Sequence, residues 1–205
     1  SLLAGLAWAD GLLPDLDEPV RERIRDGGFE SDQNSTITWR HLLTNTSEWE
    51  GELFGKADTV DRGRDLAREG VGRKDSSRPL QAPGTYWEYN DVRVNRLSLC
   101  LLHLFNRPLP EVFAERITDP IGCTRDWVWH AYDNALVEIE GRKLPSVPGG
   151  SHWGGGLRIG AEDQERLGRL VLNRGAWDGE QVIPAAWFDL ALAQDPWPNR
   201  PVTLV

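Results

Sequence analysis

The stretch from Val92 to Phe105 places the strongest constraint on how this chain can fold. Its apolar residues recur at positions 94, 97, 101 and 104, which is the spacing of one face of a helix. A stripe of this kind must be buried against other elements, so the sequence predicts a helix packed into a globular core. The residues before it, PGTYWEYND, open with a Pro-Gly turn and place Tyr89, Asn90 and Asp91 at the start of that helix.

Length and composition are those of a globular domain. The chain has 205 residues, of which 40% are apolar and 27% are charged, with 21 glycines and 13 prolines. Ten tryptophans exceed what a core of this size needs. We expect most of them in aromatic core packing, and the alternative is that some line a pocket.

Charge and hydropathy argue against two classes of partner. The formal net charge is −9 and the basic residues are scattered, which disfavours nucleic acid and anionic membrane surfaces. No apolar run reaches about 18 residues, and the first segment lacks the basic flank and cleavage site of a signal peptide. Cys100 and Cys123 are predicted to be ordinary thiols rather than a disulfide framework, which indicates a cytoplasmic setting.

Further elements are predicted from periodicity, capping residues and turns. Thr38 is the expected N-cap of one short helix, and Pro184 is expected at the first position of the last helix. Helices are predicted over residues 2–9, 39–43, 109–117, 161–175 and 184–194. Strands with a turn at Gly141 are predicted over 126–147, followed by a glycine-rich loop and a short strand over 149–160. Residues 55–82 are predicted to form a polar excursion on the surface.

Several common catalytic motifs are missing from the sequence. The nearest approach to G-x-S-x-G, at residues 149–153, ends in Trp153 where glycine belongs. No phosphate-binding loop is present, and the glycines at 154–156 do not complete a dinucleotide-binding pattern. The four histidines show no i, i+4 pairing, so no metal site is expected.

Four segments occur in an order that resembles the β-lactamase-related serine hydrolases. They are ITWRHLLTNTSEWEG, PGTYWEYNDVRVNRLSL, ITDPIG and WGGGLRIGAEDQERLGRLVLNRGAWDGEQVIPAAW. The likeness spans about Leu2 to Trp187 and is greatest to the branch that contains 6-aminohexanoate-dimer hydrolase. It implies an α+β fold of the penicillin-binding-protein type, a helical domain packed on a domain with an antiparallel sheet. It also implies one domain over 1–205, incomplete at both ends, with 12–125 mainly helical and 126–205 containing part of the sheet.

The resemblance implies acyl transfer to a serine, followed by hydrolysis of a small amide or ester, without metal or organic cofactor. The family carries a Y-x-N motif at the head of a helix, and Tyr89, Asn90 and Asp91 match it, with Asp91 where the family usually has Asn. Tyr89 would be the acid–base group, since a tyrosine beside a lysine ammonium loses its proton more easily. Asp91 would hold the lysine or cap the helix together with Asn90. The alternative for Tyr89 is a buried core tyrosine.

Candidates for substrate contact also follow from the likeness. Glu48 and Trp49 border the cleft of such enzymes, and His152, Trp153 and Asn90 are further candidates. A structural turn is the alternative at both loops. Residues Trp129, His130 and Tyr132 are weaker candidates, because alternating aromatic residues are typical of a two-faced strand.

The serine nucleophile of the family lies in an S-x-x-K motif, and no such motif occurs in this sequence. Ser1 is followed by Ala4 at the lysine position. We therefore expect S-x-x-K before Ser1 and a K-T-G-like segment after the last residue, which makes this chain inactive alone. Residues 158–160, Arg-Ile-Gly, imitate the latter segment but precede the wrong helix. The alternatives are a non-catalytic binding or scaffold module of the same fold and an unrelated tryptophan-rich ligand-binding domain.

Overall fold

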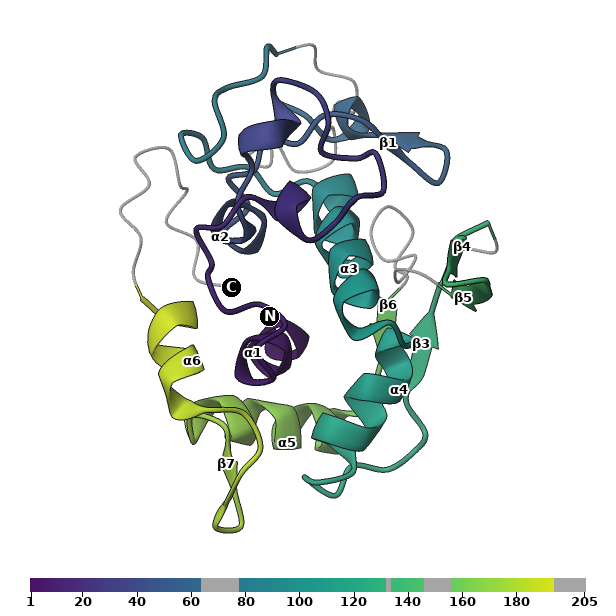
Figure 1. Cartoon of the computed structure of the whole chain (residues 1–205). Coiled ribbons are helices and arrows are strands. Elements are labelled where there is room, and N and C mark those ends of the chain that lie inside the picture. The colour runs from purple at the N-terminus through teal and green to yellow at the C-terminus, as the bar shows by residue number, and fades with distance from the viewer. Residues whose placement is uncertain (64–77, 132–133, 146–155, 194–205) are drawn as a thin grey trace. The chain divides into compact units, whose positions relative to one another are not determined.

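A computed structural model describes residues 1–63, 78–131, 134–145 and 156–193 of the chain (Figure 1). The chain divides into two compact units. Unit 1 consists of Ser1–Asp15 and the described part of Ser98–Gln194, and unit 2 consists of the described part of Leu16–Leu97. Helices and short antiparallel strand pairs together give the mixed content of the predicted α+β class.

The described residues form mainly α-helices and two-stranded antiparallel sheets. The α-helices are α1 Leu2–Ala9, α2 Trp39–Leu43, α3 Asp91–Phe105, α4 Leu109–Phe113, α5 Ala161–Leu172 and α6 Ala185–Ala191. The strands of the described residues form antiparallel pairs, which are β1 Glu52–Leu53 with β2 Lys56–Ala57, β3 Val128–His130 with β6 Gly156–Arg158, β4 Leu136–Ile139 with β5 Arg142–Pro145, and β7 Ala176–Trp177 with β8 Glu180–Gln181.

The predicted helices are all present, with small differences at their ends. The helix expected over 109–117 ends as an α-helix at Phe113 and continues as a π-helical turn over Ala114–Thr118. Pro184 lies one place before the predicted position, as the N-cap of α6. Thr38 caps α2 as predicted, because its hydroxyl oxygen accepts the N–H of His41 at 3.3 Å.

The core of unit 1 forms around α1, which α5 and α6 flank (Figure 1). Leu6 and Ala7 of α1 are fully buried. Gly5 lets the ring of Trp187 approach the helix, since a Cβ at Gly5 would lie 2.6 Å from Trp187 Cδ1. Trp8 also contacts Trp187, with ring centroids 6.2 Å apart. The absence of a side chain at Gly5 therefore sets how closely α6 packs on α1.

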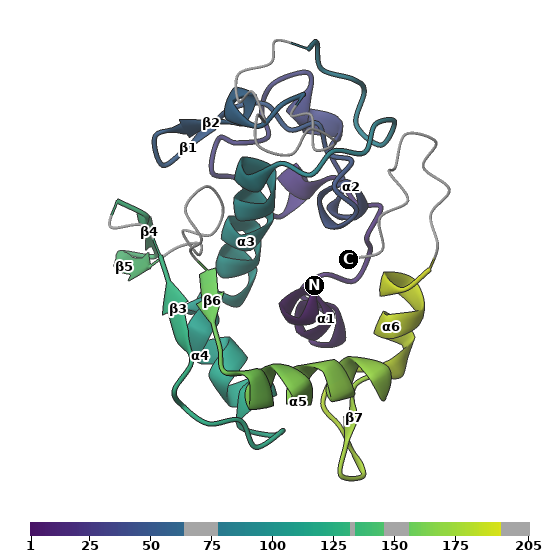
Figure 2. The same ribbon diagram turned by 180° about the vertical axis from the view of Figure 1, so that it is seen from behind.

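Strands β3 and β6 lie side by side, which can be followed from both directions (Figure 1 and Figure 2). Trp127 and Trp129, two residues apart, both pack edge-on against Phe113, with centroids 5.4 and 5.8 Å apart. Trp129 is thus a half-buried strand residue that packs on buried Phe113, which fits the two-faced strand that the sequence favours. His130 is exposed on β3, and Tyr132 lies outside the described residues.

Two further expectations concern the thiols and membrane spans. Cys100 and Cys123 are both free, as predicted. Burial, followed by the charge of Asp163, raises the pKa of Cys123 to about 11, so this thiol stays protonated at neutral pH. None of the helices in the described ranges is both long and apolar enough to cross a membrane.

The close contact at Gly5 leads to a stability prediction. We expect Gly5→Ala to lower the free energy of unfolding by about 1–3 kcal/mol, because the new methyl group overlaps the Trp187 ring. Gly168→Ala in α5 is the matched control, since nothing lies within 4 Å of the added Cβ there. The control should raise the free energy of unfolding by roughly 0.5–1 kcal/mol. Urea unfolding measures the change in the free energy of unfolding for each variant. Changes of the same sign in the two variants would contradict the close contact between Gly5 and Trp187.

Candidate active site

The Pro-Gly turn that opens the candidate segment is fixed against α2. Gly84 has φ +84°, and a Cβ there would lie 2.6 Å from His41 Nε2, so glycine is required for both backbone conformation and space. The Gly84 N–H donates to the Thr46 carbonyl at 2.8 Å, and the Glu88 N–H donates to the Asn45 carbonyl at 3.0 Å. Residues 84–88 therefore run along residues 45–46 within unit 2.

Side chains alternate between inside and outside as this segment approaches α3. Glu88 and Asn90 are buried, whereas Tyr89 between them is 40% exposed. Burial thus alternates over these three residues, as it does where neighbouring side chains point in opposite directions. The alternative of a buried core tyrosine is therefore not what the structure shows. The tyrosine side chain reaches solvent from a backbone whose two neighbouring side chains are anchored inside.

Asn90 is the N-cap of α3. Its side-chain oxygen accepts the N–H of Val92 at 3.0 Å and of Arg93 at 3.2 Å, and its amide donates to the Asp58 carbonyl at 2.9 Å. Asp91 follows as the first helical residue, is buried, and donates its backbone N–H to Asp61 Oδ2 at 3.1 Å. The side chain of Asn90 therefore caps α3. The role of Asp91 in holding a lysine stays a prediction.

The guanidinium of Arg93, in the first turn of α3, is surrounded by buried carboxylates. It approaches Glu48 Oε1 at 2.6 Å, Glu88 Oε2 at 3.3 Å and Asp58 Oδ2 at 3.5 Å. Its Nε also donates to the carbonyl of Trp49 at 3.1 Å. One arginine of α3 therefore binds three carboxylates that come from three separate segments of unit 2.

Arg78 provides a second bridge between two of these carboxylates. Its two terminal nitrogens donate to the two oxygens of Glu48 at 2.7 Å each, and it also contacts Glu88 Oε2 at 2.5 Å. Arg62 pairs with Asp58 at 2.8 Å. We call this set the ion cluster, and its members are Glu48, Asp58, Glu88, Arg62, Arg78 and Arg93.

The ion cluster is balanced in charge, with three carboxylates and three guanidiniums. Burial alone would raise the pKa of Glu48, but hydrogen bonds and charges from Arg78 and Arg93 outweigh it, so that this pKa lies below its ordinary value. Burial alone would also lower the pKa of Arg78, and its bonds to Glu48 and Glu88 raise it instead. Both groups are therefore held in their charged forms.

Glu48 and Trp49 were predicted to contact substrate from an exposed loop, and the structure buries both. Glu48 is 0% exposed and Trp49 is 2% exposed, and the Trp49 indole N–H donates to the Gly28 carbonyl at 2.7 Å. Their contact with substrate stays a prediction. Sequence reasoning did not single out Glu88 or Arg93. The available signal was a pair of arginines, Arg93 and Arg96, three positions apart in a helix with an apolar stripe. The structure buries both, and a buried arginine needs acidic partners.

His152 and Trp153 lie outside the described residues, so their place beside Tyr89 stays a prediction. Among the described residues no group of three or more His, Cys, Asp or Glu side chains is arranged to hold a metal ion. The polar excursion expected over 55–82 is buried in part, because it supplies Asp58 and Arg78 to the ion cluster.

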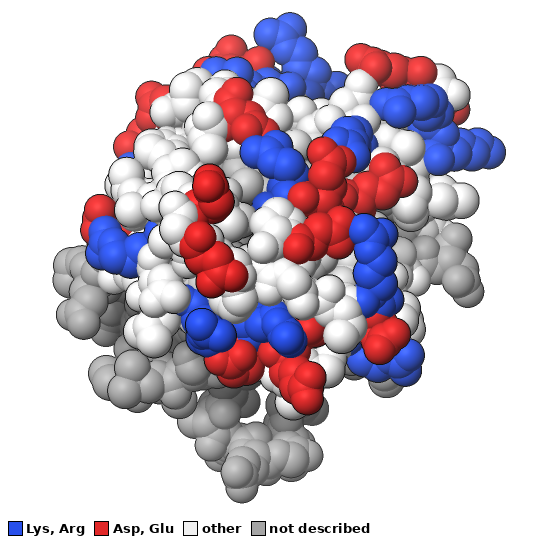
Figure 3. Space-filling model, turned by 90° about the horizontal axis from the view of Figure 1, so that it is seen from below, with Lys and Arg blue, Asp and Glu red and all other residues white. Residues whose placement is uncertain are grey.

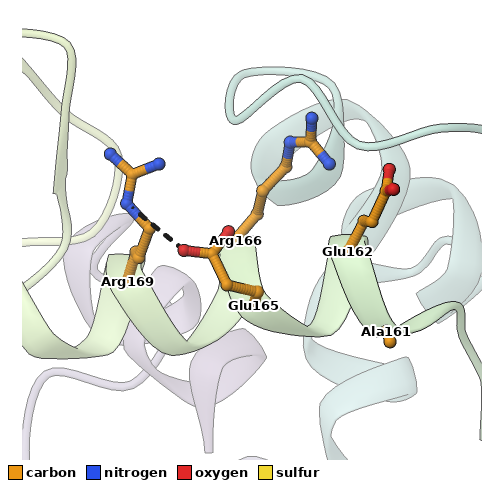
Figure 4. A pocket seen from close by; sticks show the side chains of 5 residues that line it. All are labelled: Ala161, Glu162, Glu165, Arg166 and Arg169. Atoms are coloured by element: carbon orange, nitrogen blue, oxygen red, sulfur yellow. Dashed lines mark ion pairs between the residues drawn. The ribbon is translucent and has the colours of Figure 1, made fainter.

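Unit 1 carries a shallow pocket on the outer side of α5, lined by Ala161, Glu162, Glu165, Arg166 and Arg169 (Figure 4). Glu165 and Arg169 form an ion pair of 3.6 Å across one turn. Acidic and basic side chains are interspersed over the face seen in Figure 3, rather than gathered by sign. The pocket holds none of the predicted site residues.

Comparison with known proteins places the chain in a family. The family model described as beta-lactamase matches residues 1–204. This chain belongs to the beta-lactamase family. The order of the four sequence segments is thereby explained, and the resemblance predicted from them is confirmed. No curated protein sequence matches this beta-lactamase-family chain.

Solved structures share the fold at low sequence identity. A 6-aminohexanoate-dimer hydrolase homologue from Bacillus anthracis is 19% identical with a TM-score of 0.58, and 92% of this chain covers 50% of that one. A penicillin-binding protein from Bacillus halodurans is 18% identical with a TM-score of 0.59, with coverages of 94% and 59%. The D-alanine carboxypeptidase AmpC from Burkholderia cenocepacia is 20% identical with a TM-score of 0.54, with coverages of 93% and 50%.

These likenesses establish a fold of the β-lactamase and penicillin-binding-protein type. The chain spans about half the length of the solved structures it matches. At the level of the family, its relatives are hydrolases.

The buried carboxylate of Glu48 leads to a prediction about stability and pH. At neutral pH we expect Glu48→Gln to lower the free energy of unfolding by about 3–5 kcal/mol, because it leaves buried arginine charge uncompensated. Glu50→Gln is the matched control two residues away, where the carboxylate bonds an exposed serine, and it should cost at most about 1 kcal/mol.

The pH dependence follows from the direction of the Glu48 pKa. Since this pKa is lower in the folded chain than its ordinary value of 4.5, the unfolded chain takes up the proton first as the pH falls. The stabilising contribution is present above pH 4.5 and is lost as the pH falls through the folded-state pKa. Urea unfolding over a pH series should show the wild type approaching Glu48→Gln in acid, and a difference independent of pH would contradict this.

Proposed function

We propose that this chain is part of a serine hydrolase that cleaves a small amide or ester by acyl transfer, with Tyr89 as the acid–base group. The observation that carries the proposal is the exposed Tyr89 side chain, which stands between buried Glu88 and buried Asn90 at the start of α3. Membership of the beta-lactamase family supports the reaction class, and two of the similar structures are named as a 6-aminohexanoate-dimer hydrolase and a D-alanine carboxypeptidase.

The chemistry requires a serine that attacks the carbonyl carbon of the substrate. A base removes the serine proton during the attack, and an acid then gives a proton to the departing amine or alcohol. A phenol has an ordinary pKa of about 10, and a neighbouring ammonium group stabilises its phenolate form. Tyr89 can then accept the proton from serine and deliver it to the leaving group, and water completes the turnover by the reverse sequence.

The serine and its lysine belong to the remainder of the whole protein in this proposal, since the 205 residues contain no S-x-x-K. The same observation supports a second candidate, a non-catalytic family member that binds a ligand without turnover. An S-x-x-K motif in the whole protein, together with labelling of its serine by a fluorophosphonate, would select the enzyme. Failure of the whole protein to label would select the binding module, and the 205-residue chain alone is expected to stay unlabelled.

The role of Tyr89 is tested by removing its hydroxyl group. We expect Tyr89→Phe in the whole protein to hydrolyse a p-nitrophenyl ester about 10²–10⁴-fold more slowly, with little loss of stability, because the ring remains. Tyr86→Phe is the matched control. It removes the same group three residues earlier, where the ring lies over Arg78 at 4.3 Å, and it should keep the wild-type rate. An unchanged kcat in Tyr89→Phe would exclude the role.

A further inference from the structure

We propose that Glu88 is a positioning residue for Tyr89, acting through its buried ion pairs with Arg93 and Arg78. The inference rests on the proposed function of Tyr89. It adds to that function a residue which touches no substrate but determines where the phenol points.

Glu88 is fixed by contacts on its backbone and its side chain. Its N–H donates to the carbonyl of Asn45, and its Oε1 accepts the N–H of Gly63 at 2.6 Å. The other carboxylate oxygen lies 2.5 Å from Arg78 Nη2 and 3.3 Å from Arg93 Nη1. This side chain is held inside, and the next residue, Tyr89, has a side chain that is 40% exposed.

Arg93 connects the two neighbours of Tyr89 to each other. Its guanidinium pairs with the carboxylate of Glu88, and its backbone N–H donates to the side chain of Asn90. Tyr89 thus lies at the outer end of a short loop that one buried residue closes on both sides. The backbone that carries Tyr89 is therefore anchored on both sides of this residue.

The contacts that anchor the loop around Tyr89 depend on charge as well as on shape. Arg93 and Arg78 also both pair with the buried carboxylate of Glu48, which holds the two guanidiniums in place where they bind Glu88. Glu88→Gln keeps the size of the side chain and one acceptor oxygen but removes the charge that pairs with both arginines. The variant therefore loosens the loop around Tyr89 without opening a cavity.

The first experiment uses the chain as it is. It contains three tyrosines, so incorporation of 3-fluorotyrosine gives three ¹⁹F signals, and Tyr89→Phe identifies the one from Tyr89. We expect this signal to shift and broaden in Glu88→Gln. Asp163→Asn is the control, because it removes a buried carboxylate of unit 1, which Thr124 and Arg166 hold, and it should leave the signal unchanged. An unchanged Tyr89 signal in Glu88→Gln would overturn the proposal.

The second experiment separates positioning from general stability in the whole protein. Glu88→Gln should lower kcat by on the order of 10²-fold with little change in KM, since a displaced catalytic group slows the chemical step. In the Tyr89→Phe background the same substitution should cause no further loss, because Glu88 acts only through Tyr89. Equal losses in both backgrounds would mean a merely structural role and overturn the proposal.

Two further outcomes are distinguishable. If Glu88→Gln does not fold, Arg78→Lys is the second variant. It keeps a positive charge but loses the paired hydrogen bonds of the guanidinium to Glu48 and its contact with Glu88. It should lower kcat in the wild-type background and cause no further loss in the Tyr89→Phe background. If Tyr89→Phe itself keeps the full rate, the proposed function fails and this inference fails with it. A loss in Tyr89→Phe with none in Glu88→Gln overturns the inference alone.

Discussion

The ion pair between Glu48 and Arg93 is the interaction on which the local structure of unit 2 depends. The two residues are 45 positions apart in the chain, and both are almost fully buried. Burying an isolated charge is costly, so each residue needs partners of opposite charge inside: Arg93 and Arg78 for Glu48, and Glu48, Glu88 and Asp58 for Arg93. A buried pair adds little stability relative to an apolar pair of the same shape, but it permits few alternative arrangements. Its main effect is to fix which segments meet.

The segments that meet are those that present Tyr89. Glu48 pairs with Arg78 and with Arg93, which lies in the first turn of α3. Glu88 also pairs with Arg93 and Arg78. Asn90 then caps α3 while binding the carbonyl of Asp58, whose side chain belongs to the same ion cluster. The exposed tyrosine is therefore supported by a buried framework of charges, although the residue itself is close to solvent. This arrangement supports the acid–base role proposed for Tyr89, because such a role requires a fixed direction during proton transfer.

Local patterns were enough to predict most of the helices and the capping residue Thr38. An apolar stripe or a capping threonine acts within a few residues, and such signals are readable from one sequence. The pairing of β3 with β6 was not predicted, because it joins strands separated by a hairpin and a glycine-rich stretch. Glu48 was expected in an exposed loop, since a charged residue beside a turn is usually solvated. Its burial depends on arginines far along the chain, and no local pattern shows that contact.

The energetic coupling of Glu48 and Arg93 inside unit 2 can be measured by a double-mutant cycle. The free energy of unfolding would be measured by urea titration for the wild type, Glu48→Gln, Arg93→Gln and the double variant. If the pair organises unit 2, the double variant should be more stable than the sum of the single effects implies, by about 1–3 kcal/mol. Single effects that add to within about 0.5 kcal/mol would mean that the two residues are not coupled and that the pair does not organise unit 2.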